Sequence, residues 1–242
     1  MNDISRLPEG GPVGNSVYPP TIKEQILEVL TFCFLIVPGL AFSFVAGPAL
    51  KENFFLGVAG AIISDLALVT LVLFFLWHNS EKLSRVGWIS KGYIKEIGLG
   101  LVIFPVMMYA LSFVTSWLQS LGLSFPKGHI PSFLEPSHTS QYIVATILVI
   151  VVAISEETIF RGYLILRFKS VTGSRVAAVV ISSFIFSIGH GYEGLGGVVV
   201  VGIMGAVFAT IYLWRKSLIA PIVLHFMQDF IAIVLLPLMA NK

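Results

Sequence analysis

The sequence predicts an all-α fold, a polytopic bundle of transmembrane helices with about seven spans. Of the 242 residues, 56% are hydrophobic and 12% are charged, whereas about a quarter of the residues in a soluble domain are charged. The mean hydropathy is +0.91, so most of the surface must face lipid. The apolar runs are too long and too uniform for barrel strands, which alternate over about 9–11 residues. Helices must therefore cross the bilayer.

Seven apolar segments fill most of the chain, and a helix needs about 20 such residues to span a membrane. The segments lie at about 24–47, 54–77, 93–122, 140–166, 174–190, 195–214 and 217–239. The third and fourth are long enough to tilt, the fifth and sixth are short, and the seventh has polar residues in its middle. Six or eight spans therefore stay open as alternatives.

The chain divides into a polar tail and one membrane domain. Residues 1–23 are polar and rich in Pro and Gly, so we interpret them as a flexible tail. Residues 24–242 are expected to form a single transmembrane helical domain in contact with the lipid bilayer. The net charge of +2 gives no indication of a nucleic-acid partner, and the sequence indicates no oligomeric state.

Basic residues between the segments predict the orientation, because cytoplasmic loops are enriched in Lys and Arg. The connection near 78–95 is basic, the turn near 167–175 carries Arg167, Lys169 and Arg175, and another basic pair precedes the last segment. The alternate connections carry fewer such residues. With seven spans, this pattern places the N-terminus in the cytoplasm.

Ionisable side chains within the apolar segments indicate a functional site, because burying a charge in a membrane is costly. The candidates are Asp65, Glu156, Glu157, Arg161, His190, His225 and Asp229. Asp65 stands alone in the second segment, where we expect a packing or hydrogen-bonding role. The other six form three groups on the fourth, fifth and seventh segments. Glu193, in the short connection beside His190, has no specific role indicated by the sequence.

Helical spacing places these groups on defined faces. Glu157 and Arg161 are four residues apart, so they share a face and can pair. Glu156 points about 100° away from Glu157 and needs a different partner. Two further pairs are one turn apart: Phe186 with His190, and His225 with Asp229.

The depth of the polar residues follows from the helical rise of about 1.5 Å per residue. Measured from the basic residue at the end of each helix, four of them lie about 13–22 Å deep. These four are Glu156, His190, His225 and Asp229. Three segments therefore present one polar cluster in one layer of the membrane. For any single group, a structural ion pair or a histidine bonded to the backbone is the alternative.

The residue types in the cluster favour hydrolysis by an activated water. Cys33 is the single cysteine and lies far away in sequence, and no serine has the signature of an activated nucleophile. Glu156 can take a proton from water, and a nearby imidazole can share the proton transfer. No cofactor is then required.

A metal-dependent mechanism is the alternative, because two His with carboxylates form a known ligand set for catalytic zinc. The H-E-x-x-H helix of many zinc proteases is absent, so spacing does not indicate a metal. If a divalent metal such as zinc is needed, its ligands are expected among Glu156, His190, His225 and Asp229.

Three motifs in order resemble the type II CAAX protease family, the CAAX prenyl endopeptidase and bacteriocin-processing (CPBP) intramembrane proteases. That family is marked by E-E-x-x-x-R, then F-x-x-x-H, then H-x-x-x-N or H-x-x-x-D, on separate transmembrane helices. The corresponding stretches here are Glu156–Arg161, Phe186–His190 and His225–Asp229. The resemblance covers about residues 140–235, which are expected to form the protease-like core.

The resemblance implies a membrane-embedded endopeptidase in which Glu156 and His190 activate water. It implies that His225 and the last residue of its motif stabilise the oxyanion. The supporting residues would be Glu157, Arg161 and Phe186. The last motif ends in Asp229, where the prenyl-processing members usually have Asn, and an ionised Asp cannot donate a hydrogen bond. Protonation, orientation of His225 and metal binding stay open as roles for Asp229.

The expected substrate is a peptide or membrane protein, membrane-associated and either prenylated or carrying a leader peptide. The expected location is a bacterial or archaeal cell membrane. A non-catalytic immunity or scaffold protein with the same fold is the main alternative function. A proton-coupled transporter agrees less well with the sequence, because two halves with matching interrupted helices are not evident.

Overall fold

The computed structural model describes residues 20–46, 53–89, 91–125 and 134–240, and the side chains of the first range only as far as residue 36. Most of the flexible tail predicted for residues 1–23 lies outside the described residues. Its last two residues, Ile22 and Lys23, begin the first helix. The described part of the chain is helical with short connections, which confirms the predicted all-α class.

Each predicted apolar segment corresponds to one helical stretch. The elements are α1 (Ile22–Ala46), α2 (Phe54–His78), η1 (Leu83–Val86), α3 (Tyr93–Ser120), α4 (Thr139–Glu156), η3 (Glu157–Leu164), α5 (Ile165–Thr172), α6 (Arg175–Ile188), η4 (Gly191–Glu193), α7 (Gly194–Arg215), α8 (Ile219–Asp229), η5 (Phe230–Leu235) and α9 (Leu236–Ala240). Two stretches are continuous rods that contain a π-helical part, α4–η3–α5 and α8–η5–α9.

Five helical stretches of the described chain are long and apolar enough to cross a membrane. They are Phe54–His78, Tyr93–Ser120, Thr139–Thr172, Gly191–Arg215 and Ile219–Ala240. Helix α6 is apolar but has only 14 residues, so it spans about 21 Å, less than the hydrocarbon thickness of about 30 Å. Helix α6 is therefore shorter than a full membrane span, and the motif that ends in His190 begins near its C-terminal end at Phe186.

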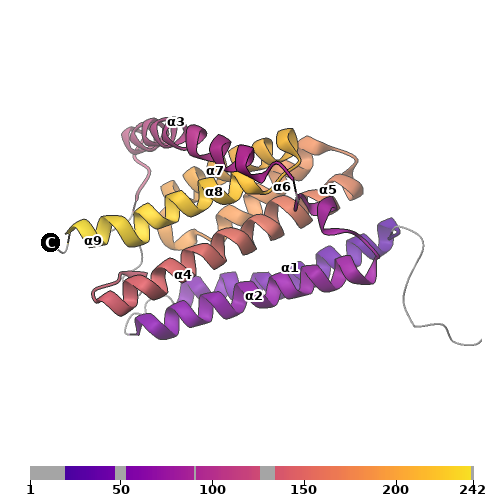
Figure 1. Cartoon of the computed structure of the whole chain (residues 1–242), viewed down its shortest axis with the longest axis horizontal. Helices are drawn as coiled ribbons and strands as arrows, with labels where there is room; N and C mark the ends of the chain where they lie inside the picture. Colours follow the sequence, from indigo (N-terminus) through magenta and orange to yellow (C-terminus); the bar gives the residue numbers. More distant parts are fainter. Residues whose placement is uncertain (1–19, 47–52, 90, 126–133, 241–242) are drawn as a thin grey trace, which may run out of the picture.

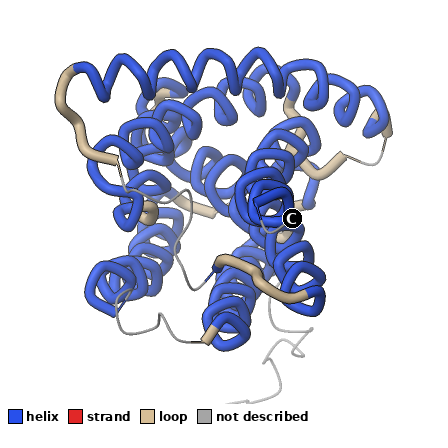
Figure 2. Tube along the Cα trace, turned by 90° about the vertical axis from the view of Figure 1, so that its left-hand side faces the viewer, coloured by secondary structure: helices blue, strands red, loops and turns tan. Residues whose placement is uncertain are grey.

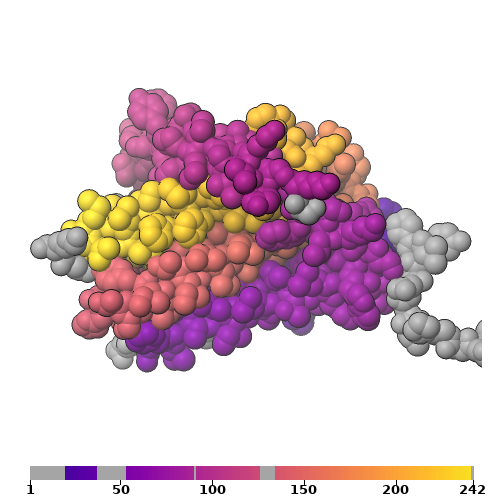
Figure 3. Space-filling view, in the orientation of Figure 1, coloured from indigo at the N-terminus to yellow at the C-terminus, as the bar shows by residue number. Residues whose placement is uncertain are grey.

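Helix α4 occupies a central position in the bundle. It packs against α2 on one side and against α8 and η5 on another, and the space-filling view shows it between them (Figure 3). Helices α1 and α2 run along one side, while α3 lies across α7 and α8 (Figure 1). Seen along the bundle, α3 crosses over helices that are viewed nearly end-on (Figure 2). The C-terminal end of α4 therefore points into the interior.

Lipid is the solvent for much of this surface. Large apolar side chains are exposed along the outer helices, including Phe34, Ile94, Val102, Tyr109 and Phe113. The interior holds a cluster in which Val72, Leu76, Tyr163, Phe186, Phe208 and Leu224 are almost fully buried. Close packing at Gly162 is possible because glycine has no side chain. A Cβ there would lie 2.7 Å from the Val86 carbonyl oxygen.

Arg167, predicted to contribute to a basic cytoplasmic turn, is instead buried in α5. The helix continues to Thr172, and Arg167 is 1% exposed because it pairs with two carboxylates inside the bundle. Lys169 and Arg175 are exposed, so they remain as charges at that turn. The cytoplasmic location of the N-terminus stays a prediction.

Candidate active site

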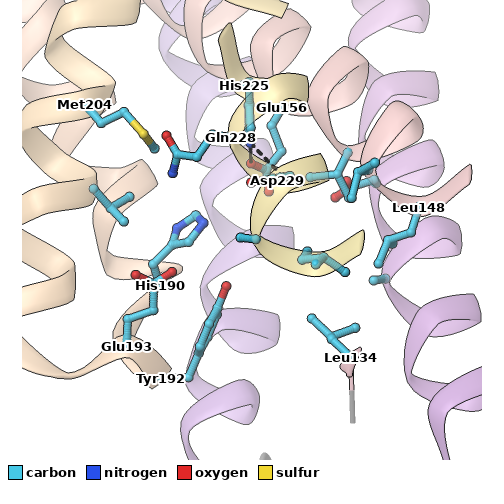
Figure 4. A pocket seen from close by; sticks show the side chains of 17 residues that line it. Leu134, Leu148, Glu156, His190, Tyr192, Glu193, Met204, His225, Gln228 and Asp229 are labelled. Atoms are coloured by element: carbon cyan, nitrogen blue, oxygen red, sulfur yellow. Dashed lines mark ion pairs between the residues drawn. The ribbon is translucent and has the colours of Figure 1, made fainter. Parts of the chain in front are cut away.

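A pocket of about 320 Å³ lies between α2, α4, η4, α7 and the α8–η5 stretch. It contains all four residues predicted to be catalytic, Glu156, His190, His225 and Asp229. Figure 4 shows their side chains converging from different helices. One cavity therefore brings together residues that are far apart in the chain, such as Glu156 and Asp229.

Glu157 contacts two other buried side chains beside the pocket and holds them in place. Arg161 Nη1 donates to Glu157 Oε1 at 2.8 Å, so the predicted pair is confirmed. His225 Nδ1 lies 2.8 Å from the same oxygen. The side chains of Glu157, Arg161 and His225 are at most 3% exposed. One carboxylate therefore joins the first motif to the third, a connection that helical spacing does not reveal.

Phe186 holds the charged partners in place from a third helix. Its ring lies 4.1 Å from the guanidinium carbon of Arg161, a cation–π contact, and 4.8 Å from the His190 ring. Gly205 on α7 leaves the room needed, because a Cβ there would be 3.3 Å from both Arg161 and Phe186. The phenylalanine of the second motif thus contacts residues of the first and second motifs.

The Nε2 atom of His225 faces two carboxyl groups of the pocket. It lies 3.4 Å from Asp229 Oδ2 and 3.6 Å from Glu156 Oε2, the contacts drawn as dashed lines in Figure 4. Because Nδ1 is directed at Glu157, Nε2 is the nitrogen available to a bound molecule. Asp229 lies where it can orient the ring, as its spacing predicts.

His190 has a defined tautomer when it is neutral. Its Nδ1 lies 3.0 Å from the Phe186 carbonyl oxygen, and a carbonyl oxygen only accepts, so Nδ1 carries the hydrogen. The other nitrogen, Nε2, is then free to accept a proton or a hydrogen bond. Figure 4 shows the ring pointing into the pocket.

Two π-helical segments begin directly after acidic residues of the pocket. Glu156 ends α4 before η3, and Asp229 ends α8 before η5. Such wide turns often occur at functional sites, and here they change the direction of the side chains that follow. Ser182 of α6 supports the first one by donating to the Phe160 carbonyl at 2.7 Å. The apolar pattern of the sequence carries no sign of either segment.

Four polar residues that were not predicted to be catalytic also line the pocket: Asp65, Tyr192, Glu193 and Gln228. Asp65 was expected to pack or to form a hydrogen bond, but its Oδ2 atom is buried without a partner. A signal for it was present in the sequence. Asp65 is about 20 Å from His78 at the end of its helix by the helical rise, the same depth as the other candidates.

The metal alternative finds no ready donor set here. Among the residues that the structure describes, no group of three or more His, Cys, Asp or Glu side chains is arranged to hold a metal ion.

Residues 138–231 match the family model described as type II CAAX prenyl endopeptidase Rce1-like. This match confirms the resemblance based on the three motifs. It begins at the N-terminus of α4 and includes all three motifs, whereas α1, α2 and α3 lie outside it. No curated protein and no solved structure matches the chain.

Proposed function

We propose that the chain, whose residues 138–231 match the type II CAAX prenyl endopeptidase Rce1-like family model, is an intramembrane endopeptidase whose nucleophile is water activated by Glu156 and His190. One observation carries this proposal. A single cavity brings the carboxyl group of Glu156, 19% exposed, together with a His190 ring that has Nδ1 bonded to the backbone. A base and a hydrogen-bond acceptor for water then face the same space.

The reaction begins with a water molecule held between Glu156 and Nε2 of His190. Glu156 takes a proton from this water while the oxygen bonds to the carbonyl carbon of the substrate. The carbonyl oxygen becomes an oxyanion. Glu156 then gives the proton to the leaving nitrogen as the C–N bond breaks. Both side chains return to their starting state, and water has been divided between the two products.

His225 is assigned to the oxyanion. Its Nδ1 faces the Glu157 carboxylate, which only accepts, so His225 donates from Nε2 into the pocket when both ring nitrogens carry a hydrogen. A fixed donor there stabilises developing negative charge. Asp229 is assigned to orienting this ring, because an ionised carboxylate has no hydrogen to donate to an oxyanion. Arg161 keeps Glu157 in place and lies outside the reacting atoms.

The substrate class follows from the other wall of the pocket. This wall is apolar and is formed by Ala61, Leu134, Leu148, Val149, Val152, Ala232 and Ile233. A hydrophobic segment that enters from the bilayer would bury its side chains against this wall. We therefore propose peptide bonds of membrane-associated, prenylated or leader-peptide substrates as targets.

The test compares wild type with Glu156→Gln in liposomes that contain two quenched fluorescent peptides. One peptide carries a farnesylated Cys four residues from its C-terminus, and the other is the same peptide without the lipid. Glu156→Gln keeps the shape but removes the base, so kcat should fall about 10²–10⁴-fold. Glu135→Gln, the same change at an exposed position, should leave kcat unchanged.

Undiminished cleavage by Glu156→Gln would reject Glu156 as the base. Failure of wild type to cleave either peptide would reject the proposed substrate class. Thermal unfolding in detergent shows whether each variant is folded. The contact of Glu156 with His225 Nε2 is 3.6 Å long, and the amide oxygen of Gln can still accept there, so Glu156→Gln should change stability little.

A further inference from the structure

The carboxyl group of Asp65 enters the pocket from α2, a helix outside the family match. Helix α2 packs along α4, which places Asp65 on the same cavity as Glu156. The two side chains are close enough for their charges to interact. The mechanism above makes no use of Asp65.

Both carboxyl groups have an unused oxygen directed away from solvent. Asp65 Oδ2 and Glu156 Oε2 are buried and have no hydrogen-bond partner. The nearest basic atom to Glu156 Oε2, Nε2 of His225, is 3.6 Å away, which is too far for a hydrogen bond. A third such oxygen on this cavity is Gln228 Oε1. Buried polar atoms are normally paired, so the two carboxyl oxygens require an explanation.

The cationic side chains that the structure describes beside this pocket are already paired with other carboxyl groups. Among the described residues that line the pocket, none is a lysine or an arginine. Arg161 is bonded to Glu157, and His225 is held between Glu157 and Asp229. Two ionised carboxyl groups side by side in a membrane would repel each other, and each would lose its hydration. One proton held by the pair removes the repulsion and leaves a single charge without hydration.

We propose that Asp65 is a positioning residue for Glu156, with which it shares one proton across the pocket; this inference rests on the function proposed above. Asp65 carries the proton and donates a hydrogen bond toward Oε2 of Glu156. Glu156 is then ionised and oriented, with its other oxygen free for water. Helix α2 thereby completes a site whose three motifs all lie on other helices.

The proton balance is unchanged over one turnover. Water gives a second proton to Glu156 as its oxygen bonds to the carbonyl carbon, and this proton leaves with the amine product when the C–N bond breaks. Asp65 keeps its proton throughout. The pair ends each cycle with one proton, as it began.

The test separates hydrogen-bond donation from charge and from packing. Asp65→Asn keeps a donor at the same position, whereas Asp65→Ala removes it. Asp65→Val also lacks a donor but fills more of the space, so it replaces Asp65→Ala in the assay if that variant does not fold. Ser64→Ala is the matched control on the same helix, because Ser64 is exposed. Each variant is assayed with the two peptides in liposomes across pH 5–9.

For Asp65→Ala we expect kcat to fall about tenfold with KM within about twofold, because one oriented hydrogen bond to the base is lost. The acidic limb of the kcat profile should move about one pH unit higher, since an ionised Glu156 is no longer stabilised by a donor. Asp65→Asn should keep this limb close to that of wild type. Other titratable groups on the pocket are Glu156, His190, Tyr192, Glu193, His225 and Asp229.

Three results would overturn the inference. One is an unshifted limb in Asp65→Ala and Asp65→Val, which indicates a structural role. Another is a limb that moves to lower pH, which indicates that Asp65 is ionised and repels Glu156. The third is an acidic limb of the kcat profile that moves away from its wild-type position in Asp65→Asn. If Glu156→Gln itself stays active, the proposed function fails instead, so the two failures are distinguishable.

Discussion

Two buried polar clusters lie on the same helical rod, the α4–η3–α5 stretch, and they differ in one respect. The cluster around Arg167 has a partner for each of its charged groups, whereas the pocket around Glu156 leaves carboxyl oxygens unpaired. Both are enclosed by the helical bundle. The difference in pairing separates a group of residues that stabilises the fold from one that is open to a reacting molecule.

The cluster around Arg167 joins α1, the end of α2, η3 and α5. Arg167 Nε donates to Glu28 at 2.7 Å, and its Nη atoms donate to both oxygens of Glu81. Tyr163 Oη donates to Glu28 at 2.6 Å, and the Asn79 amide donates to the same carboxylate. A buried ion cluster is tolerated only when its hydrogen bonds are satisfied in this way.

Removing the charge of Arg167 from its paired cluster should produce the largest loss of stability. Arg167→Met keeps the length of the side chain but leaves Glu28 without its cation and Glu81 with only the half-exposed Arg85. Removal of one partner from a buried ion pair costs about 3–5 kcal/mol, measured as the free energy of unfolding in mixed detergent–SDS micelles.

Arg85→Ala is the control for this change, because it removes an exposed arginine that pairs with the same Glu81. Arg85 is 49% exposed, so its loss should cost below about 1 kcal/mol. Equal effects of Arg167→Met and Arg85→Ala would remove the distinction between a buried stabilising cluster and surface charge.

Glu157→Gln should affect both stability and activity, because Glu157 belongs to the paired network and touches the pocket through His225. The substitution leaves Arg161 buried without a counter-charge, although the contact with Phe186 compensates in part. We expect a loss of roughly 2–3 kcal/mol in unfolding free energy. We also expect kcat to fall at least about tenfold, because Nδ1 of His225 loses its anionic acceptor. A variant that is destabilised but fully active would limit Glu157 to a structural role.

Chelation should have the smallest effect. Since no group of three donors in the described residues is arranged for a metal, treatment with EDTA and with phenanthroline should change the cleavage rate less than about twofold. A loss that added zinc restores would show that the pocket acquires a metal, and the water activation proposed for Glu156 and His190 would need revision.

Much of the site was accessible from spacing within single helices. The pairing of Glu157 with Arg161 follows from four residues of separation, and the structure has it at 2.8 Å. The prediction that Glu156, His190 and His225 form one cluster follows from the helical rise, and all three line one pocket in the structure. Asp65 satisfied the same depth criterion, but it was set aside because it stood alone in its segment.

The sequence by itself determined the helices and their approximate number, because these depend on local apolar composition. The tertiary structure decided how each helix is rotated about its axis and which helices are neighbours. That rotation turns Asp65 toward Glu156, joins Glu157 to His225, and buries Arg167 between Glu28 and Glu81. Contacts between residues so far apart in the chain depend on packing between helices, which no periodicity within one helix encodes.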